Sequence, residues 1–268
     1  MHRKRWITGL IAFPILVVVA AAGGPPFYLL VAAAAVLTLY EYNQAVFTTG
    51  GNLAARLIPL VGVGLAPLIV WLAFTGNLAA VPLIIAVDLI LVSALTLPLF
   101  KDDTQAPYLV AKQVLGLAYI TVPLAFLVTI RADPKGLQWI MWILCTVFAG
   151  DIGAFYTGTY LGRHKLCPWV SPQKTIEGSL GGLAANTLVA LVLKMLLLPT
   201  LNAGPCIIFA LVVGVGGQLG DLFASEFKRS AGIKDSGILL PGHGGLLDRL
   251  DALLFAAPLA YLFKITIF

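Results

Sequence analysis

Long apolar runs dominate the chain, and short breaks containing charged residues, glycine or proline separate them. A bilayer core of about 30 Å needs about 20 apolar residues per helix, so these runs are long enough to cross a membrane. The pattern predicts nine spans, at residues 6–23, 27–46, 57–75, 78–99, 115–130, 137–160, 179–199, 203–224 and 250–268. Unbroken runs argue against an outer-membrane barrel, whose strands alternate over about ten residues.

The composition supports this assignment. Of the 268 residues, 60% are hydrophobic and 11% are charged, and the mean hydropathy is +0.97. A soluble domain is about 45–50% apolar and about 25% charged. Apolar runs from end to end exclude a soluble enzyme with one membrane tail, and the low charge excludes disorder. We expect an all-α, polytopic integral membrane protein: one transmembrane domain over 1–268, with N-terminal helices over about 1–130 and a C-terminal part of helices and cytoplasmic loops over about 137–268.

The basic residues predict the orientation, because lysine and arginine favour short cytoplasmic loops. With nine spans and a cytoplasmic N-terminus, thirteen of the 17 basic residues lie on the cytoplasmic side. The four others are Arg131, Lys135, Lys194 and Lys264. A basic start before an apolar run is also typical of a signal peptide, but another span follows directly, which favours a retained first span. We expect a cytoplasmic N-terminus.

Carboxylates gather at the cytoplasmic loop between the last two expected spans. Five of the 12 acidic residues lie in or beside it: Asp221, Glu226, Asp235, Asp248 and Asp251. Asp248 and Asp251 are three residues apart and share one helix face. Hard oxygen ligands without clustered histidines favour Mg²⁺ over zinc, and the three widely spaced cysteines offer no thiolate site. The alternative to a metal site is that these carboxylates form ion pairs with basic residues of the loop.

Basic side chains accompany these carboxylates, namely Lys228, Arg229, Lys234 and Arg249. Mg²⁺ held by a few carboxylates usually takes its other ligands from water and substrate phosphates, and lysine and arginine bind further phosphate oxygens. The combination indicates phosphoryl or nucleotidyl transfer. His243, between two glycines, could serve as a base, a phosphate donor or a structural residue.

A second polar segment follows the sixth expected span. Asp151 lies within that span, where a carboxylate costs roughly 2.5–3.5 kcal/mol on insertion scales and usually faces a polar interior. Ser171, Lys174 and Thr175 offer hydroxyls and an ammonium that suit a triphosphate. Ser171 or Thr175 could equally cap the next helix, with Glu177 in its first turn. Both roles are compatible, since a helix N-terminus favours anions.

Other features leave alternatives open. Glu41 and Asp88 lie within spans, where each could line a substrate path or make a buried hydrogen bond. The pairs Gly158-x-x-x-Gly162 and Gly216-x-x-x-Gly220 predict close packing between helices. The sequence has neither of the glycine-rich nucleotide motifs typical of soluble proteins.

The cytoplasmic loop carries a longer pattern. It reads Ser225-Glu226-Phe227-Lys228-Arg229, four residues, Lys234-Asp235-Ser236-Gly237, two residues, then Leu240-Pro241-Gly242-His243-Gly244-Gly245-Leu246-Leu247-Asp248-Arg249-Leu250-Asp251. This segment resembles the signature of the phosphatidate cytidylyltransferases, the CDP-diacylglycerol synthases. The segment from Asp151-x-Gly153-Ala154 to Ser171-Pro172-x-Lys174-Thr175-x-Glu177-Gly178 is also similar to that family. Phe155 and Ile176 depart from its usual tyrosine and tryptophan.

The resemblance implies that CTP and phosphatidic acid are converted to CDP-diacylglycerol and pyrophosphate with Mg²⁺. It places the protein in the bacterial cytoplasmic (inner) membrane, with the site at the cytoplasmic face, favours a homodimer and involves no nucleic acid. A second cation, monovalent or divalent, is compatible with it.

The residue inventory gives each group an expected role. The metal ligands are Asp221 and Asp248, with Asp251 assisting. The catalytic set is Asp221, Asp248, Lys228, Arg229 and His243. The set that binds CTP and phosphatidate is Asp151, Ser171, Lys174, Thr175, Glu177, Lys234 and Arg249. We expect Asp151, Asp221 and Asp248 to line one cavity.

Two rivals remain. A secondary transporter would use Glu41, Asp88 and Asp151 as an ion relay, but transporters commonly have repeated halves and broken helices, whereas polarity here gathers at one end. A CTP-dependent lipid-alcohol kinase would share nucleotide and metal but would transfer the γ-phosphoryl group.

Overall fold

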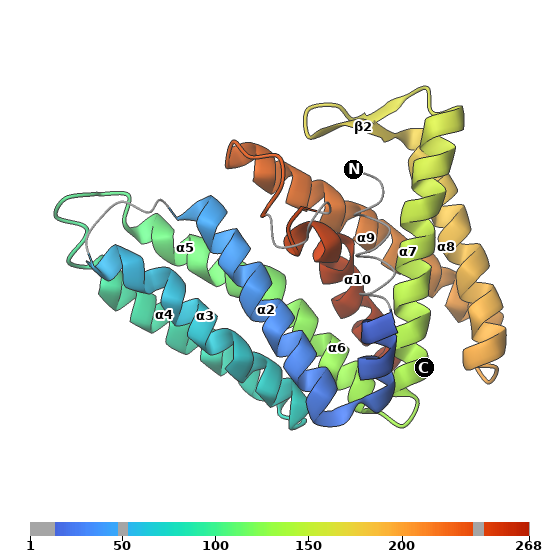
Figure 1. The fold of residues 1–268 in the computed structure, drawn as a ribbon, viewed down its shortest axis with the longest axis horizontal. Helices are drawn as coiled ribbons and strands as arrows, with labels where there is room; N and C mark the ends of the chain where they lie inside the picture. Colours follow the sequence, from blue (N-terminus) through green and yellow to red (C-terminus); the bar gives the residue numbers. More distant parts are fainter. Residues whose placement is uncertain (1–13, 48–52, 238–243, 268) are drawn as a thin grey trace. The chain divides into compact units, whose positions relative to one another are not determined.

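The computed structural model describes residues 14–47, 53–237 and 244–267, which are mostly helical (Figure 1). In the described part of the chain, seven helical segments are long and apolar enough to cross a membrane: Gly24–Val46, Leu53–Phe74, Leu78–Thr96, Pro107–Ala132, Gly136–Leu161, Ile176–Leu197 and Ala203–Ser230. The protein is therefore an all-α polytopic membrane protein, as the sequence predicts. The count of nine spans and the side of the N-terminus stay predictions.

The helices form two compact units. The first takes the described residues of Met1–Ala132 and Asp235–Leu247, and the second takes Asp133–Lys234 and Asp248–Phe268. The described residues 235–237 and 244–247, which are part of the family-like pattern, thus belong to the same unit as the N-terminal helices. The single transmembrane domain predicted from the sequence stays a prediction.

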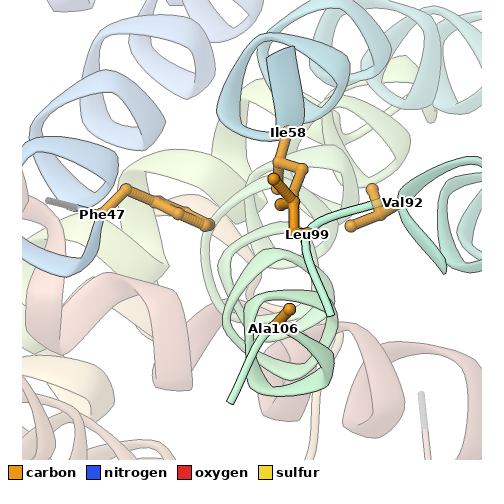
Figure 2. Close-up of a cluster of buried hydrophobic side chains, with 5 residues drawn as sticks. All are labelled: Phe47, Ile58, Val92, Leu99 and Ala106. Carbon is orange, nitrogen blue, oxygen red and sulfur yellow. The ribbon is translucent and has the colours of Figure 1, made fainter. Parts of the chain in front are cut away.

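The first unit consists of α2 (Gly24–Val46), α3 (Leu53–Phe74), η1 (Leu78–Ala80), α4 (Val81–Thr96), α5 (Pro107–Gly116), η2 (Leu117–Thr121) and α6 (Val122–Ala132). A buried cluster joins the end of α2 to α3, α4 and the connection before α5. It contains Phe47, Ile58, Val92, Leu99 and Ala106 (Figure 2). Lipid tails are as apolar as these side chains, so close packing stabilises such contacts in a membrane more than transfer from water does.

The span expected over 115–130 is longer in the structure and runs from Pro107 to Ala132. Lys112 hides this earlier start in the sequence, because a lysine inside an apolar run suggests a span boundary. Its ammonium donates to the Val46 carbonyl oxygen at 3.2 Å, at the end of α2. The π-helical turn η2 interrupts the segment just before Pro123, which has no N–H to continue the α-helical bonds.

The second unit consists of α7 (Gly136–Leu161), β1 (Lys165–Cys167), β2 (Ser171–Thr175), α8 (Ile176–Leu197), α9 (Ala203–Ser230) and α10 (Leu247–Thr266), whose first residue lies in the other unit. Figure 1 shows α7 and α8 side by side. A Cβ atom on Gly178 would lie 2.9 Å from the Ala154 carbonyl oxygen, so only glycine permits this approach. Gly158 and Gly162 pack on Thr175 in the same way, which confirms the predicted packing face.

Aromatic rings pack the other end of these helices. The Trp142 and Phe209 rings stack with centroids 4.2 Å apart, and Phe263 of α10 meets Phe209 edge-on. The Trp142 indole N–H donates to the Ala190 carbonyl oxygen at 2.8 Å. These contacts link α7, α8, α9 and α10 and hold the helices whose other ends carry the polar residues.

The segment between α7 and α8, predicted as a loop, contains a short antiparallel hairpin. Its turn closes with a 3.2 Å bond from the Val170 N–H to the Cys167 carbonyl oxygen. Pro168 stands at the second turn position, where its fixed φ is favourable. The strands are too short and polar for a periodic sequence signal.

Candidate active site

A cavity of about 440 Å³ opens in the second unit, against α7, the hairpin, α8 and α9. Small-molecule sites usually occupy about 300–1,000 Å³. Its polar lining residues are Asp151, Thr159, Ser171, Gln173, Lys174, Thr175, Ser179, Gln218 and Asp221. Four of the predicted substrate-binding residues and one predicted metal ligand therefore meet at one place.

An ion pair crosses this cavity. The Lys174 ammonium lies 2.7 Å from a carboxylate oxygen of Asp221, and the two side chains are 25% and 37% exposed. Asp151 lies within electrostatic range of both, repelled by Asp221 and attracted by Lys174. A partly exposed ion pair contributes little stability. Lys174 can therefore exchange this carboxylate for a phosphate at small cost.

The start of α8 supplies a second anion-binding feature. The Thr175 hydroxyl accepts a bond from the Gly178 N–H at 3.1 Å and caps the helix, which confirms the predicted capping role. Thr175 and Gly178 both line the cavity, so the positive end of the helix dipole faces it. This arrangement favours a bound phosphate.

Glu177 lies outside the cavity lining and holds the hairpin instead. Its carboxylate contacts the His164 ring at 2.6 Å and accepts bonds from the Arg163 and His164 N–H groups at 3.1 and 3.2 Å. The contacts keep the end of α7 close to the start of α8. Direct substrate binding by Glu177 stays a prediction.

A second ion pair lies at the end of α9. The Lys228 ammonium lies 2.5 Å from an Asp248 carboxylate oxygen, and both side chains are largely buried. The helix ends in a Schellman motif, in which Gly232 has a φ of +71°. The Ile233 N–H bonds the Lys228 carbonyl at 2.9 Å and the Gly232 N–H bonds the Arg229 carbonyl at 3.0 Å. The motif fixes Lys228 and Arg229 at the exit from α9.

The three predicted metal ligands do not form one group. Asp251 lies within electrostatic range of Asp221, Asp151 and Lys228, and its carboxylate accepts the Ala252 N–H at 2.8 Å. Asp248 is not among the cavity residues, contrary to expectation, and Lys228 is its close partner. Within the described ranges, no set of three histidine, cysteine, aspartate or glutamate side chains is placed to hold a metal ion.

The remaining predicted residues are dispersed. Lys234 and Arg249 are exposed, and His243 lies outside the described residues. Glu41 and Asp88 belong to the first unit, where their exposed fractions are 2% and 0%.

Gln218 and Ser179 were missed by the sequence analysis. The Ser179 hydroxyl donates to the Gln218 side-chain oxygen, and the Gln218 amide donates to the Ser179 carbonyl at 2.9 Å. The available signal was a glutamine inside an apolar, glycine-rich span, three residues before Asp221 and so on the same helix face.

The fold and cavity define a class: a polytopic helical membrane protein with a cavity lined by a lysine, two carboxylates and the start of a helix. The chain matches the cytidylyltransferase family over residues 3–267 and belongs to that family. It is similar to phosphatidate cytidylyltransferases of Staphylococcus haemolyticus, S. epidermidis and S. aureus, at 41% identity over 145 residues. These matches cover 54% of this chain, which spans about half the length (55%) of the curated relatives it matches.

Proposed function

We propose that the protein transfers the cytidylyl group of CTP to phosphatidic acid, giving CDP-diacylglycerol and pyrophosphate. Membership of the cytidylyltransferase family supports the use of a cytidine nucleotide, and the names of the relatives support phosphatidate as acceptor. The observation that carries the proposal is the Lys174–Asp221 pair inside a cavity that also presents Asp151 and the start of α8.

In this proposal the cavity binds the triphosphate of CTP. Lys174 leaves Asp221 and donates to phosphate oxygens, while Ser171 and the first turn of α8 bind further oxygens. A phosphatidate oxygen attacks the α-phosphorus, and the bond from that phosphorus to the β-phosphate oxygen breaks, releasing pyrophosphate. Positioned cations stabilise the charge on both sides of the reacting phosphorus without a covalent intermediate on the protein.

The basic residues at the end of α9 and the start of α10 serve the lipid phosphate and the leaving group. Lys228 and Arg229 are fixed by the Schellman motif, and Lys234 and Arg249 follow on the exposed surface. A phosphate monoester is already anionic at neutral pH, so the acceptor needs orientation more than deprotonation. This favours a positioning role for His243.

The donor set fits Mg²⁺. Mg²⁺ usually binds one or two carboxylates and takes its other ligands from water and phosphates, so a ready-made set of three is not required. Asp221, with Asp151 and Asp251 within electrostatic range, offers that arrangement, and Asp248 stays the further predicted ligand. When bound, the ion would neutralise charge on the phosphates of CTP.

The membrane setting follows from the lipid substrate. Its acyl chains stay in hydrocarbon while its head group reaches CTP, so the site belongs at the cytoplasmic surface of the inner membrane. A homodimer is also part of the proposal, on the strength of the family-like signature.

The test uses purified protein in micelles that contain phosphatidate and a lipid alcohol such as diacylglycerol, with Mg²⁺ and CTP labelled on either the α- or the γ-phosphate. The proposal predicts α-label in a lipid product and γ-label in pyrophosphate. Label from the γ-phosphate in lipid would instead establish the lipid-alcohol kinase, and no labelled product would contradict both. Lys174→Met should lower transfer by about 10- to 100-fold at low CTP concentration, whereas Lys165→Met, on the hairpin outside the cavity lining, should retain it.

A further inference from the structure

Glu41 is a buried carboxylate on α2 that the proposed chemistry does not use. Its exposed fraction is 2%. One carboxylate oxygen accepts the Leu246 N–H at 2.9 Å, and the other accepts the Leu247 N–H at 2.9 Å and the Ser236 hydroxyl at 3.2 Å. The carboxylate is therefore satisfied by a loop about 200 residues away in sequence, within the same compact unit.

The loop is shaped to receive this carboxylate. A Cβ atom on Gly237 would lie 2.5 Å from one Glu41 oxygen, and a Cβ on Gly245 would lie 2.5 Å from the other. Only glycine at these positions leaves the space. The partners of Glu41 lie near both ends of the loop. Ser236 comes two residues after Lys234, and Leu247 directly precedes Asp248.

The negative charge of Glu41 lies at the start of helix α10. Leu247 is the first residue of α10, so its N–H and that of Leu246 are helix-terminal donors without an intrahelical partner. A carboxylate at a helix N-terminus is stabilised by hydrogen bonds and by the helix dipole. Glu41 thus binds the two N–H groups at the start of α10 that lie in its own unit, and Asp248 and Arg249 follow Leu247 directly in the sequence.

We propose that Glu41 is a positioning residue, which clamps Ser236, Leu246 and Leu247 and thereby holds the residues that directly precede Asp248 and Arg249 in the chain. The expected effect of Glu41 on kcat rests on the proposed function. The clamp itself is separate from the chemistry. The hydrogen bonds of Glu41 confirm the buried hydrogen bond considered in the sequence analysis.

The test compares three changes at Glu41 with one at its neighbour. Glu41→Ala removes the clamp, and Glu41→Gln replaces one acceptor oxygen by an amide that faces a backbone N–H. Glu41→Asp keeps the charge on a shorter side chain. The matched control is Tyr42→Phe, which removes a partly buried 2.8 Å hydrogen bond from the same helix to the Lys112 carbonyl and leaves the loop contacts of Glu41 intact.

Two readouts separate the clamp from general instability. We expect kcat to fall by about 10- to 100-fold in Glu41→Ala and Glu41→Gln, because small misplacements at a reacting centre cost about that much. The KM for CTP should stay nearly unchanged, and Glu41→Asp should recover part of kcat. Tyr42→Phe should lower the thermal stability about as much as Glu41→Gln does. It should nevertheless retain the kcat of the wild-type protein. An equal kcat loss in Tyr42→Phe, or a wild-type kcat in Glu41→Gln, would overturn the proposal.

Hydrogen exchange distinguishes failure of the clamp from failure of the proposed function. The Leu246 and Leu247 amides should be protected in the wild-type protein and exchange at least about tenfold faster in Glu41→Ala, since an opened hydrogen bond exposes them. Unchanged exchange would refute the clamp even if the enzyme makes CDP-diacylglycerol. Faster exchange in a protein that makes no CDP-diacylglycerol would support the clamp and refute the proposed function.

Discussion

The Lys228–Asp248 pair offers a quantitative test, because its two charges are largely removed from solvent. The side chains are 13% and 10% exposed and the ionic atoms lie 2.5 Å apart. Replacing Lys228 by Met keeps the stem volume but takes the ammonium away from Asp248. Breaking a buried pair on one side costs about 3–5 kcal/mol, and the residual exposure favours the lower end. At about 2–4 °C per kcal/mol, the melting temperature should fall by about 6–12 °C.

The assay is thermal unfolding in detergent of the wild type, Lys228→Met, Asp248→Asn and the double variant. The double variant should recover at least about 1 kcal/mol relative to the sum of the single changes, because coupled neighbours are not additive. It should nevertheless remain inactive. If the stability losses of the two single variants simply add up in the double variant, the coupling between Lys228 and Asp248 is refuted. An active double variant would refute the catalytic role of both residues.

Three further predictions concern the cavity and its supports. Lys174→Met should raise the KM for CTP by about 10- to 100-fold in steady-state assays, since hydrogen bonds to charged groups contribute about 1.5–3 kcal/mol. Gly220→Ala should destabilise the protein by about 1–3 kcal/mol in thermal unfolding, because its Cβ would overlap the α10 backbone; Gly204→Ala, with open space around it, should not. Glu177→Gln should speed tryptic cleavage after Lys165 by loosening the hairpin, and an unchanged digestion rate would contradict its anchoring role.

The sequence predicted the helical membrane fold well because hydropathy acts over whole spans. It failed where one residue was ambiguous. Lys112 suggested a boundary inside a segment that starts at Pro107, because its ammonium finds a backbone carbonyl that no sequence pattern reveals. The hairpin between α7 and α8 is likewise too short to show a periodicity.

The sequence likewise predicted some residues of the site but not the contacts that depend on helix packing. Asp151, Lys174 and Asp221 were each predicted as site residues, and they line one cavity, since a carboxylate inside a span and a family-like motif are both visible in the sequence. The pairing of Asp248 with Lys228 depends on how α10 packs against α9. The link from Glu41 to Leu247 depends on a contact about 200 residues apart, which spacing alone cannot predict.

Binding of CTP in the cavity against α7, the hairpin, α8 and α9 can be measured with a photoreactive CTP analogue, crosslinked to the purified protein and mapped by mass spectrometry. If CTP binds there, labelled peptides come from residues 151–179 and 218–221, and unlabelled CTP competes with the labelling. Competed labelling confined to the N-terminal helices would contradict CTP binding in this cavity.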